Sequence, residues 1–214
     1  MKKGTTEIAI VLDCSGSMDA IRDDAVGAFN AFLREQQGQP GDARLTLVLF
    51  HHSVRVAARG VDLRRARPLD RASFVPNGGT ALLDAVGWTV DDLATRILDL
   101  PEEERPERVV VAILTDGREN SSRHYTRDAI FSRIRLRTEV DGWTFVYLGA
   151  DQDAFDEARS IGIPDERSSV YAATGAGTYA GMSRISRVVS DVRSSGSVSL
   201  DWDGRPHDRK RNLH

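Results

Sequence analysis

The chain has 214 residues, 40% of them hydrophobic and 29% charged, which is the composition of an ordinary globular protein with one buried core. The formal net charge of −3 gives no electrostatic case for nucleic acid or an anionic membrane as a partner, and we expect neither. Lysine occurs only at positions 2, 3 and 210, so residues 4–209 can hold neither a Walker-type phosphate loop nor a Schiff-base lysine.

The single cysteine, Cys14, excludes an intramolecular disulfide and is typical of a protein in a reducing compartment. The basic start of the chain is followed by an apolar run of only five residues, 8–12, which is too short for the core of a signal peptide. No stretch approaches the roughly 20 apolar residues that a membrane span requires. We therefore expect a cytoplasmic protein.

Apolar runs separated by turn residues predict alternating strands and helices. In chain order, we expect a strand at 7–12, a helix at 18–36, strands at 44–50 and 54–59, a helix at 80–98, a strand at 109–114, a helix at 126–140, a strand at 143–148, a helix at 153–161, a strand at 169–172 and a helix at 179–192. The short link at 51–53 predicts a hairpin, so the strand at 54–59 should be an antiparallel edge strand.

This alternation is typical of the α/β class, with a doubly wound, mostly parallel central sheet, helices on both faces and one antiparallel edge strand. We expect residues 1–193 to form a single domain. Residues 194–214 are rich in Ser, Gly, Asp and Arg, and this polar composition predicts a flexible C-terminal tail.

A candidate metal site follows the first strand. The segment Asp13-Cys14-Ser15-Gly16-Ser17 places one carboxylate and two hydroxyls at alternate positions of a tight turn, and such oxygens suit a hard cation such as Mg²⁺. In a doubly wound sheet, ligands bind beyond the carboxyl ends of the strands, where strand order reverses. If the strands at 7–12 and 109–114 are adjacent, Asp116 lies at the same crevice as Asp13.

Three segments, in their order and spacing, resemble the loops of the von Willebrand factor A (VWA) domain family: Asp13-x-Ser15-Gly16-Ser17, Asn77-Gly78-Gly79-Thr80 and Leu114-Thr115-Asp116-Gly117. The resemblance covers about residues 5–193 and implies a Rossmann-like VWA fold. It also implies an intact metal-ion-dependent adhesion site (MIDAS), coordinated in part through water by Asp13, Ser15, Ser17, Thr80 and Asp116. We expect Mg²⁺ at this site, with Mn²⁺ or Ca²⁺ as substitutes.

Three of the five implied ligands are neutral hydroxyls, so the dication stays electrophilic and keeps a coordination position for an outside ligand. We therefore expect a non-enzymatic, metal-dependent protein-interaction module that binds an Asp or Glu of a partner. The family resemblance implies that this partner is an AAA+ ATPase or a multiprotein assembly.

Two other functions stay open. A metal-dependent phosphohydrolase or phosphotransferase would use Asp13 as its nucleophile, but Ser15 stands where such enzymes need a second acid, and the core lacks a lysine. A scaffold protein would use the metal only to stabilise its native fold.

Neighbouring residues also have structural interpretations. Ser17 is a plausible N-cap of the helix at 18–36, and Thr80 should stand at the start of a helix. We expect Arg118, Glu119 and Asn120 to form the rim of the metal face and to select partners.

The remaining polar groups are expected to be structural. His51 and His52 are adjacent, so on a strand their side chains would point to opposite faces, and we expect a turn or surface role. Cys14 should be a small buried thiol. The arginines at 59–71 are interrupted by acidic residues and should form a solvated loop.

Overall fold

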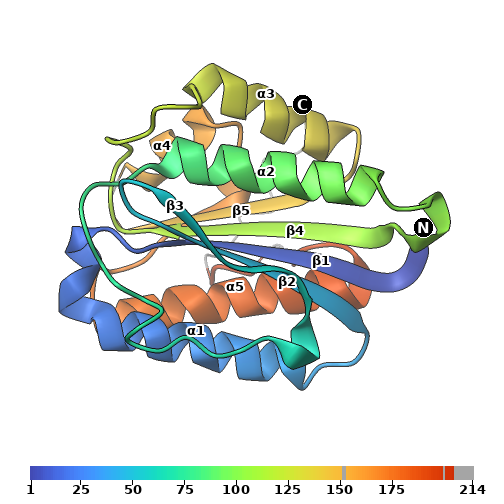
Figure 1. Ribbon diagram of the computed structural model, residues 1–214, viewed down its shortest axis with the longest axis horizontal. Coiled ribbons are helices and arrows are strands. Elements are labelled where there is room, and N and C mark those ends of the chain that lie inside the picture. The colour runs from blue at the N-terminus through green and yellow to red at the C-terminus, as the bar shows by residue number, and fades with distance from the viewer. Residues whose placement is uncertain (151–152, 200, 205–214) are drawn as a thin grey trace.

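β1 (Lys2–Asp13) is an inner strand of the sheet with a parallel strand on either side, and its apolar run is buried because helices cover both faces of the sheet. In the computed structural model, which describes residues 1–150, 153–199 and 201–204, six strands form one sheet in the order β3-β2-β1-β4-β5-β6 (Figure 1). Only β3 is antiparallel. The other strands are β2 (Asp42–Phe50), β3 (Val54–Asp62), β4 (Pro106–Thr115), β5 (Thr144–Gly149) and β6 (Ser168–Val170).

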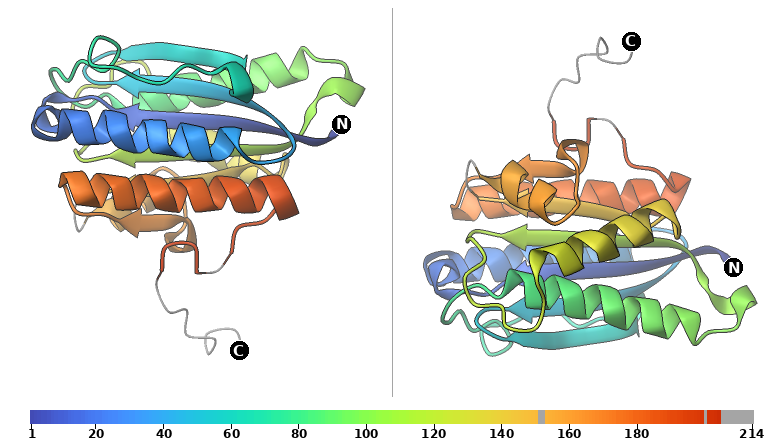
Figure 2. Two further views of the ribbon diagram at one scale, coloured as in Figure 1. Left: turned by 90° about the horizontal axis from the view of Figure 1, so that it is seen from below. Right: turned by 90° about the horizontal axis from the view of Figure 1, so that it is seen from above.

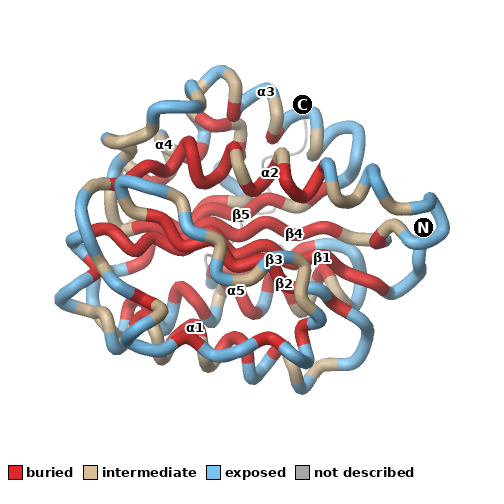
Figure 3. The backbone as a smooth tube through the Cα atoms, in the orientation of Figure 1, coloured by how far each residue is buried: buried red, intermediate tan, exposed pale blue. Residues whose placement is uncertain are grey.

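Helices cover both faces of the sheet (Figure 2). In the described part of the chain, the α-helices are α1 (Arg22–Gln37), α2 (Leu82–Leu98), α3 (Arg127–Glu139), α4 (Ala154–Ser160) and α5 (Gly175–Ser195). Because strand side chains alternate, Ile8, Ile10 and Leu12 pack in the core beneath α1 and α5, whereas Ala9 and Val11 pack toward α2 and α3. Figure 3 shows this buried sheet between helices whose outer sides are exposed.

Short 3-10 helices lie in the connections: η1 (Gly16–Ile21), η2 (Leu63–Arg65), η3 (Glu102–Glu104) and η4 (Asp165–Arg167). Within the described residues, no helix combines the length and apolar character needed to cross a membrane.

The predicted fold class is confirmed, including the antiparallel edge strand and the adjacency of β1 and β4. Helix starts were predicted less well. The helix expected from residue 18 begins as η1 and becomes α-helical only at Arg22. Helix α5 begins at Gly175 rather than at residue 179, because the Thr174 side chain accepts a hydrogen bond from Gly177 N at 3.1 Å and caps it.

The structure also differs from the expectation of a flexible tail beginning at residue 194. Helix α5 continues to Ser195, and the chain beyond it packs back onto the core through the buried side chains of Val198 and Trp202. The indole N–H of Trp202 donates to the Glu166 carbonyl at 2.9 Å. Residues 194–199 and 201–204 are therefore not a tail, and residues 205–214 lie outside the described part of the chain.

Candidate metal site

Three loops meet beyond the carboxyl ends of β1 and β4 and are joined there by backbone hydrogen bonds. Gly16 N donates to Gly78 O at 3.0 Å, and Asn77 N donates to Cys14 O at 3.0 Å. Asn120 N donates to Thr80 O, also at 3.0 Å. The loops that carry the five predicted ligands are thus held side by side.

Asp13 ends β1 and is fully buried. One carboxylate oxygen, Oδ1, accepts from Ser15 N at 2.7 Å, and the other, Oδ2, accepts from the Thr115 hydroxyl at 2.5 Å. Burial raises the pKa of Asp13 to about 6, although the hydrogen bonds from Thr115 and Ser15 oppose the rise, and the nearby charge of Asp116 adds to it. Burial at this position therefore destabilises the ionised form of Asp13.

The two serines connect Asp13 to Asp116. The Ser15 and Ser17 hydroxyl oxygens lie 3.1 Å apart, and the Ser17 hydroxyl donates to Asp116 Oδ1 at 2.8 Å. Asp116 is half-buried, and this burial raises its pKa. Ser17 is exposed, so the cluster is closed on the sheet side and open on the solvent side.

Thr80 is buried and lies against the turn after Asp116. A Cβ at Gly117 would come within 2.9 Å of the Thr80 hydroxyl oxygen, so glycine is required there for this approach. The structure therefore brings the side chains of Asp13, Ser15, Ser17 and Asp116 together and places Thr80 beside them.

The donor set suits a divalent cation. Its two carboxylates form no ion pair with any Arg or Lys of the described residues, and its remaining groups are hydroxyls. Among the described residues, no three His, Cys, Asp or Glu side chains gather closely enough to hold a metal by themselves. Any ion here would therefore depend on the hydroxyl oxygens, a set suited to Mg²⁺.

Neither Ser17 nor Thr80 has the predicted capping role. The N-cap of η1 is Ser15, which forms no side-chain cap bond, and α2 begins after Ala81. The Ser17 hydroxyl instead donates to Asp116, across a sequence separation of 99 residues. The Ser17 hydroxyl thus makes a tertiary hydrogen bond in place of the local capping bond that we expected.

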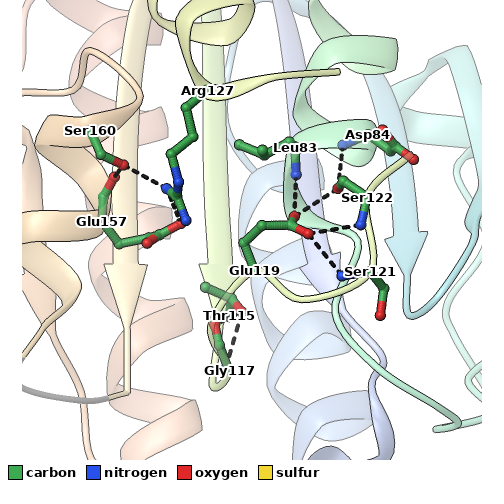
Figure 4. A network of polar contacts seen from close by, with 10 residues as sticks. All are labelled: Leu83, Asp84, Thr115, Gly117, Glu119, Ser121, Ser122, Arg127, Glu157 and Ser160. Carbon is green, nitrogen blue, oxygen red and sulfur yellow. Dashed lines mark hydrogen bonds and ion pairs between the residues drawn. The ribbon is translucent and has the colours of Figure 1, made fainter. Parts of the chain in front are cut away.

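The prediction that Glu119 and Asn120 select partners is not supported by their contacts. Glu119 Oε1 accepts from Ser121 N and Ser122 N, and Oε2 accepts from Leu83 N and the Ser122 hydroxyl, as Figure 4 shows. Asn120 Oδ1 accepts from Thr80 N at 2.8 Å. Arg118 is ion-paired with Asp153. These side chains hold the loop after Asp116 in place.

Asp84 is a positioning residue that the sequence did not reveal. Its buried carboxylate accepts from three successive backbone N–H groups, those of Arg123, His124 and Tyr125, at 2.9 to 3.0 Å. The one available signal was a single acidic residue in the apolar first two turns of the helix, Leu82-Leu83-Asp84-Ala85-Val86-Gly87-Trp88.

The two histidines lie in the β2–β3 turn, as predicted, but their side chains do not point apart. Their ring centroids are 4.3 Å apart, because the chain turns at Ser53, whose N–H donates to His51 Nδ1 at 3.1 Å. Cys14 is a buried free thiol, as expected, and burial raises its pKa to about 11. In the arginine-rich segment, Arg59 and Arg71 pair with Asp92 and Asp23.

Replacing Glu119 by Ala tests its structural role. We expect the variant to lose about 2 kcal/mol of unfolding free energy, because three backbone N–H groups lose their acceptor. Urea unfolding measures this, with the exposed Glu103→Ala as the matched control. A partner-selecting role predicts unchanged stability instead.

No protein-family model matches this chain, and no curated protein matches it either. Solved structures do. The vWF domain of the type V pilus tip protein Mfa5 from Porphyromonas gingivalis superposes with a TM-score of 0.64 at 13% identity, covering 91% of this chain and 98% of that domain. The PilB minor pilin from Streptococcus sanguinis gives a TM-score of 0.60 at 13% identity, over 90% of this chain and 63% of the pilin.

Proximal thread matrix protein 1 from the mussel byssus, in a structure with a zinc-occupied MIDAS motif, gives a TM-score of 0.56 at 19% identity. The match covers 86% of this chain but only 45% of the mussel protein, so the chain spans about half of that protein's length. These likenesses establish that the chain has the fold of a VWA domain.

Proposed function

We propose that Asp13, Ser15, Ser17, Thr80 and Asp116 bind Mg²⁺, in part through water, and that the site is a MIDAS. The observation that carries the proposal is a pair of neighbouring carboxylates, linked through serine hydroxyls, whose pKa values are raised by burial and which form no ion pair with a basic side chain of the described residues. A dication would supply the missing positive charge. Mn²⁺ or Ca²⁺ would serve as substitutes.

The same site is proposed to bind an Asp or Glu of a protein partner. Support comes from the open side of the cluster, where exposed Ser17 and half-buried Asp116 leave room for an incoming carboxylate. The metal would supply an electrophilic centre. Asp13 and Asp116 would provide only two negative charges, which leaves the ion attractive to a third carboxylate.

We propose a non-enzymatic role, in keeping with the pilus and byssus proteins whose fold this chain shares. An AAA+ ATPase or a multiprotein assembly is the proposed partner. A reducing, cytoplasmic location would suit the free thiol of Cys14.

The test is affinity capture from source cells with the immobilised chain in Mg²⁺, followed by elution with EDTA. We expect the partner to elute with EDTA and to be absent when Asp116→Ala is the bait, because the substitution removes half of the charge that would hold the metal. The exposed Asp128→Ala on α3 is the control and should capture the partner normally.

Capture that survives both EDTA and Asp116→Ala would refute the interaction role. If Mg²⁺ raises the melting temperature but no captured protein depends on it, the metal is purely structural and the chain is better described as a scaffold.

A further inference from the structure

A groove of about 470 Å³ lies between the edge strand β3 and residues 65–73, a segment that we call the strap (Figure 1). The strap is held to α1 by Asn30, whose side chain exchanges two hydrogen bonds with the Leu69 backbone, at 2.8 and 2.9 Å. Among the described residues, the one hydrogen bond from a β3 side chain to the strap is donated by Arg55 to the Ser73 carbonyl. Because the strap is anchored mainly on α1, a groove stays open between it and β3.

The groove has an apolar wall that is partly open to solvent. Leu45 and Leu47 of β2 lie buried at its base, whereas Val56, Ala58 and Val61 of β3 are only partly buried. Register pairs Leu47 with Ala58 and Leu45 with Val61, so these side chains share one face of the sheet. At this edge of the sheet, an apolar surface therefore remains within reach of an outside side chain.

The arginines around the groove divide into a paired set and an unpaired set. Residues 55–71 contain six arginines, and three of them pair with acidic residues of other elements: Arg59 with Asp92, Arg64 with Asp42 and Arg71 with Asp23. The other three, Arg55, Arg65 and Arg67, form no ion pair with any described residue, and all three are exposed and line the groove.

The groove therefore carries an excess of positive charge. The one acidic residue in its lining, Asp70, uses Oδ1 to accept from Ser73 N at 2.7 Å within the strap itself. Three guanidinium groups thus face one carboxylate. Asp62, at the end of β3, does not line the groove, and counting it would still leave an excess of one positive charge.

We propose that this groove binds an extended, acidic segment of a partner protein, whose carboxylates pair with Arg55, Arg65 and Arg67. Side chains of an extended segment alternate, so one row can lie against the apolar wall while the other reaches the arginines at the rim. The stretch of β3 from Arg55 to Val61 is about 20 Å long at about 3.3 Å per residue, which suits an extended chain better than a small anion. Among the described residues, β3 also has no strand on its outer side, so its backbone can pair with such a segment.

The experiment is calorimetric titration of the full chain with a blocked acidic peptide, Glu-Val-Glu-Val-Glu-Val-Glu, in EDTA, which keeps the candidate metal site empty. We expect a dissociation constant of about 0.1 mM, weakened about threefold in Arg65→Gln and in Arg67→Gln, because each substitution removes one surface ion pair. The double variant should bind about tenfold more weakly than wild type. Both variants should fold, because neither guanidinium group makes a hydrogen bond or ion pair within the described part of the chain.

Arg64→Gln is the matched control, because Arg64 is equally exposed and adjacent to Arg65 but pairs with Asp42 and does not line the groove. It should bind the peptide as wild type does, and so should Asp116→Ala, which separates this surface from the MIDAS proposal. A peptide with Lys in place of Glu should not bind, and one with Ser in place of Val should bind about fivefold more weakly.

Three results would overturn the proposal: no binding of the acidic peptide, equal binding of the Lys peptide, or equal weakening by Arg64→Gln and by Arg65→Gln or Arg67→Gln. The last of these would show that the peptide responds to the general surface charge and not to the groove.

Discussion

Asp13→Asn is expected to be more stable than the wild-type chain in metal-free solution at neutral pH, by about 3 kcal/mol, and to lose its response to Mg²⁺. The pKa of Asp13 rises from its ordinary 3.8 to about 6 because the carboxyl is buried. Asn has the same shape as Asp, so its side-chain oxygen can accept from Ser15 N and its NH₂ group can donate to the Thr115 hydroxyl oxygen. The Thr115 hydroxyl can then donate to the Gly117 carbonyl, which lies 3.1 Å away.

The wild-type stability should therefore depend on pH. Below pH 3.8, Asp13 is protonated in both the folded and unfolded states and makes no difference. Between 3.8 and about 6, the unfolded state releases the proton first, so the free energy of unfolding falls as pH rises and then stays low. Asp13→Asn should remove this part of the dependence.

Urea unfolding from pH 4 to pH 8, in EDTA and in excess Mg²⁺, measures both effects. At 100 times its dissociation constant, Mg²⁺ should stabilise the wild-type chain by about 2.7 kcal/mol and leave Asp13→Asn unchanged. The exposed Asp128→Asn should behave as wild type within about 0.5 kcal/mol. A less stable Asp13→Asn chain in EDTA, or an equal gain from Mg²⁺, would contradict the MIDAS proposal.

Trp202→Ala should lower the free energy of unfolding by about 3 to 5 kcal/mol, because it removes the largest of the fully buried side chains. The substitution also removes the 2.9 Å hydrogen bond that the indole N–H donates to the Glu166 carbonyl. Since Trp202 holds the segment after α5 against the core, this segment should become accessible to proteases.

Circular dichroism during urea unfolding measures the loss, and limited proteolysis measures the release of the segment. Trp202→Phe is the matched variant: it keeps a buried apolar ring but loses the indole N–H and the atoms of the five-membered ring, so a smaller loss of about 1 to 3 kcal/mol is expected. If Trp202→Ala changes stability by less than about 0.5 kcal/mol, residues 196–199 and 201–204 behave as the flexible tail that their composition predicts.

The amino-acid sequence by itself determined the sheet and the position of the candidate site. Runs such as Val109–Leu114 are short, continuously apolar and rich in β-branched residues, which predicts buried strands, and their alternation with helical segments predicts a parallel sheet. Parallel strands place their carboxyl ends at one edge, so Asp13 and Asp116 had to lie near each other once β1 and β4 were adjacent.

Only the tertiary structure decided which polar residues support that site and which segments are ordered. Glu119 accepts from Leu83 N in α2, and Asp84 in α2 accepts from backbone N–H groups of the loop after Glu119. These partners lie 36 to 41 residues apart, and no local pattern encodes such a pairing. Trp202 lies in a mostly polar segment, and its burial depends on its packing against the core and on its hydrogen bond to the Glu166 carbonyl of η4. Strand register likewise places Glu7, Arg44 and Asp62 side by side on β1, β2 and β3, because hydrogen bonding between strands aligns residues that are far apart in the chain.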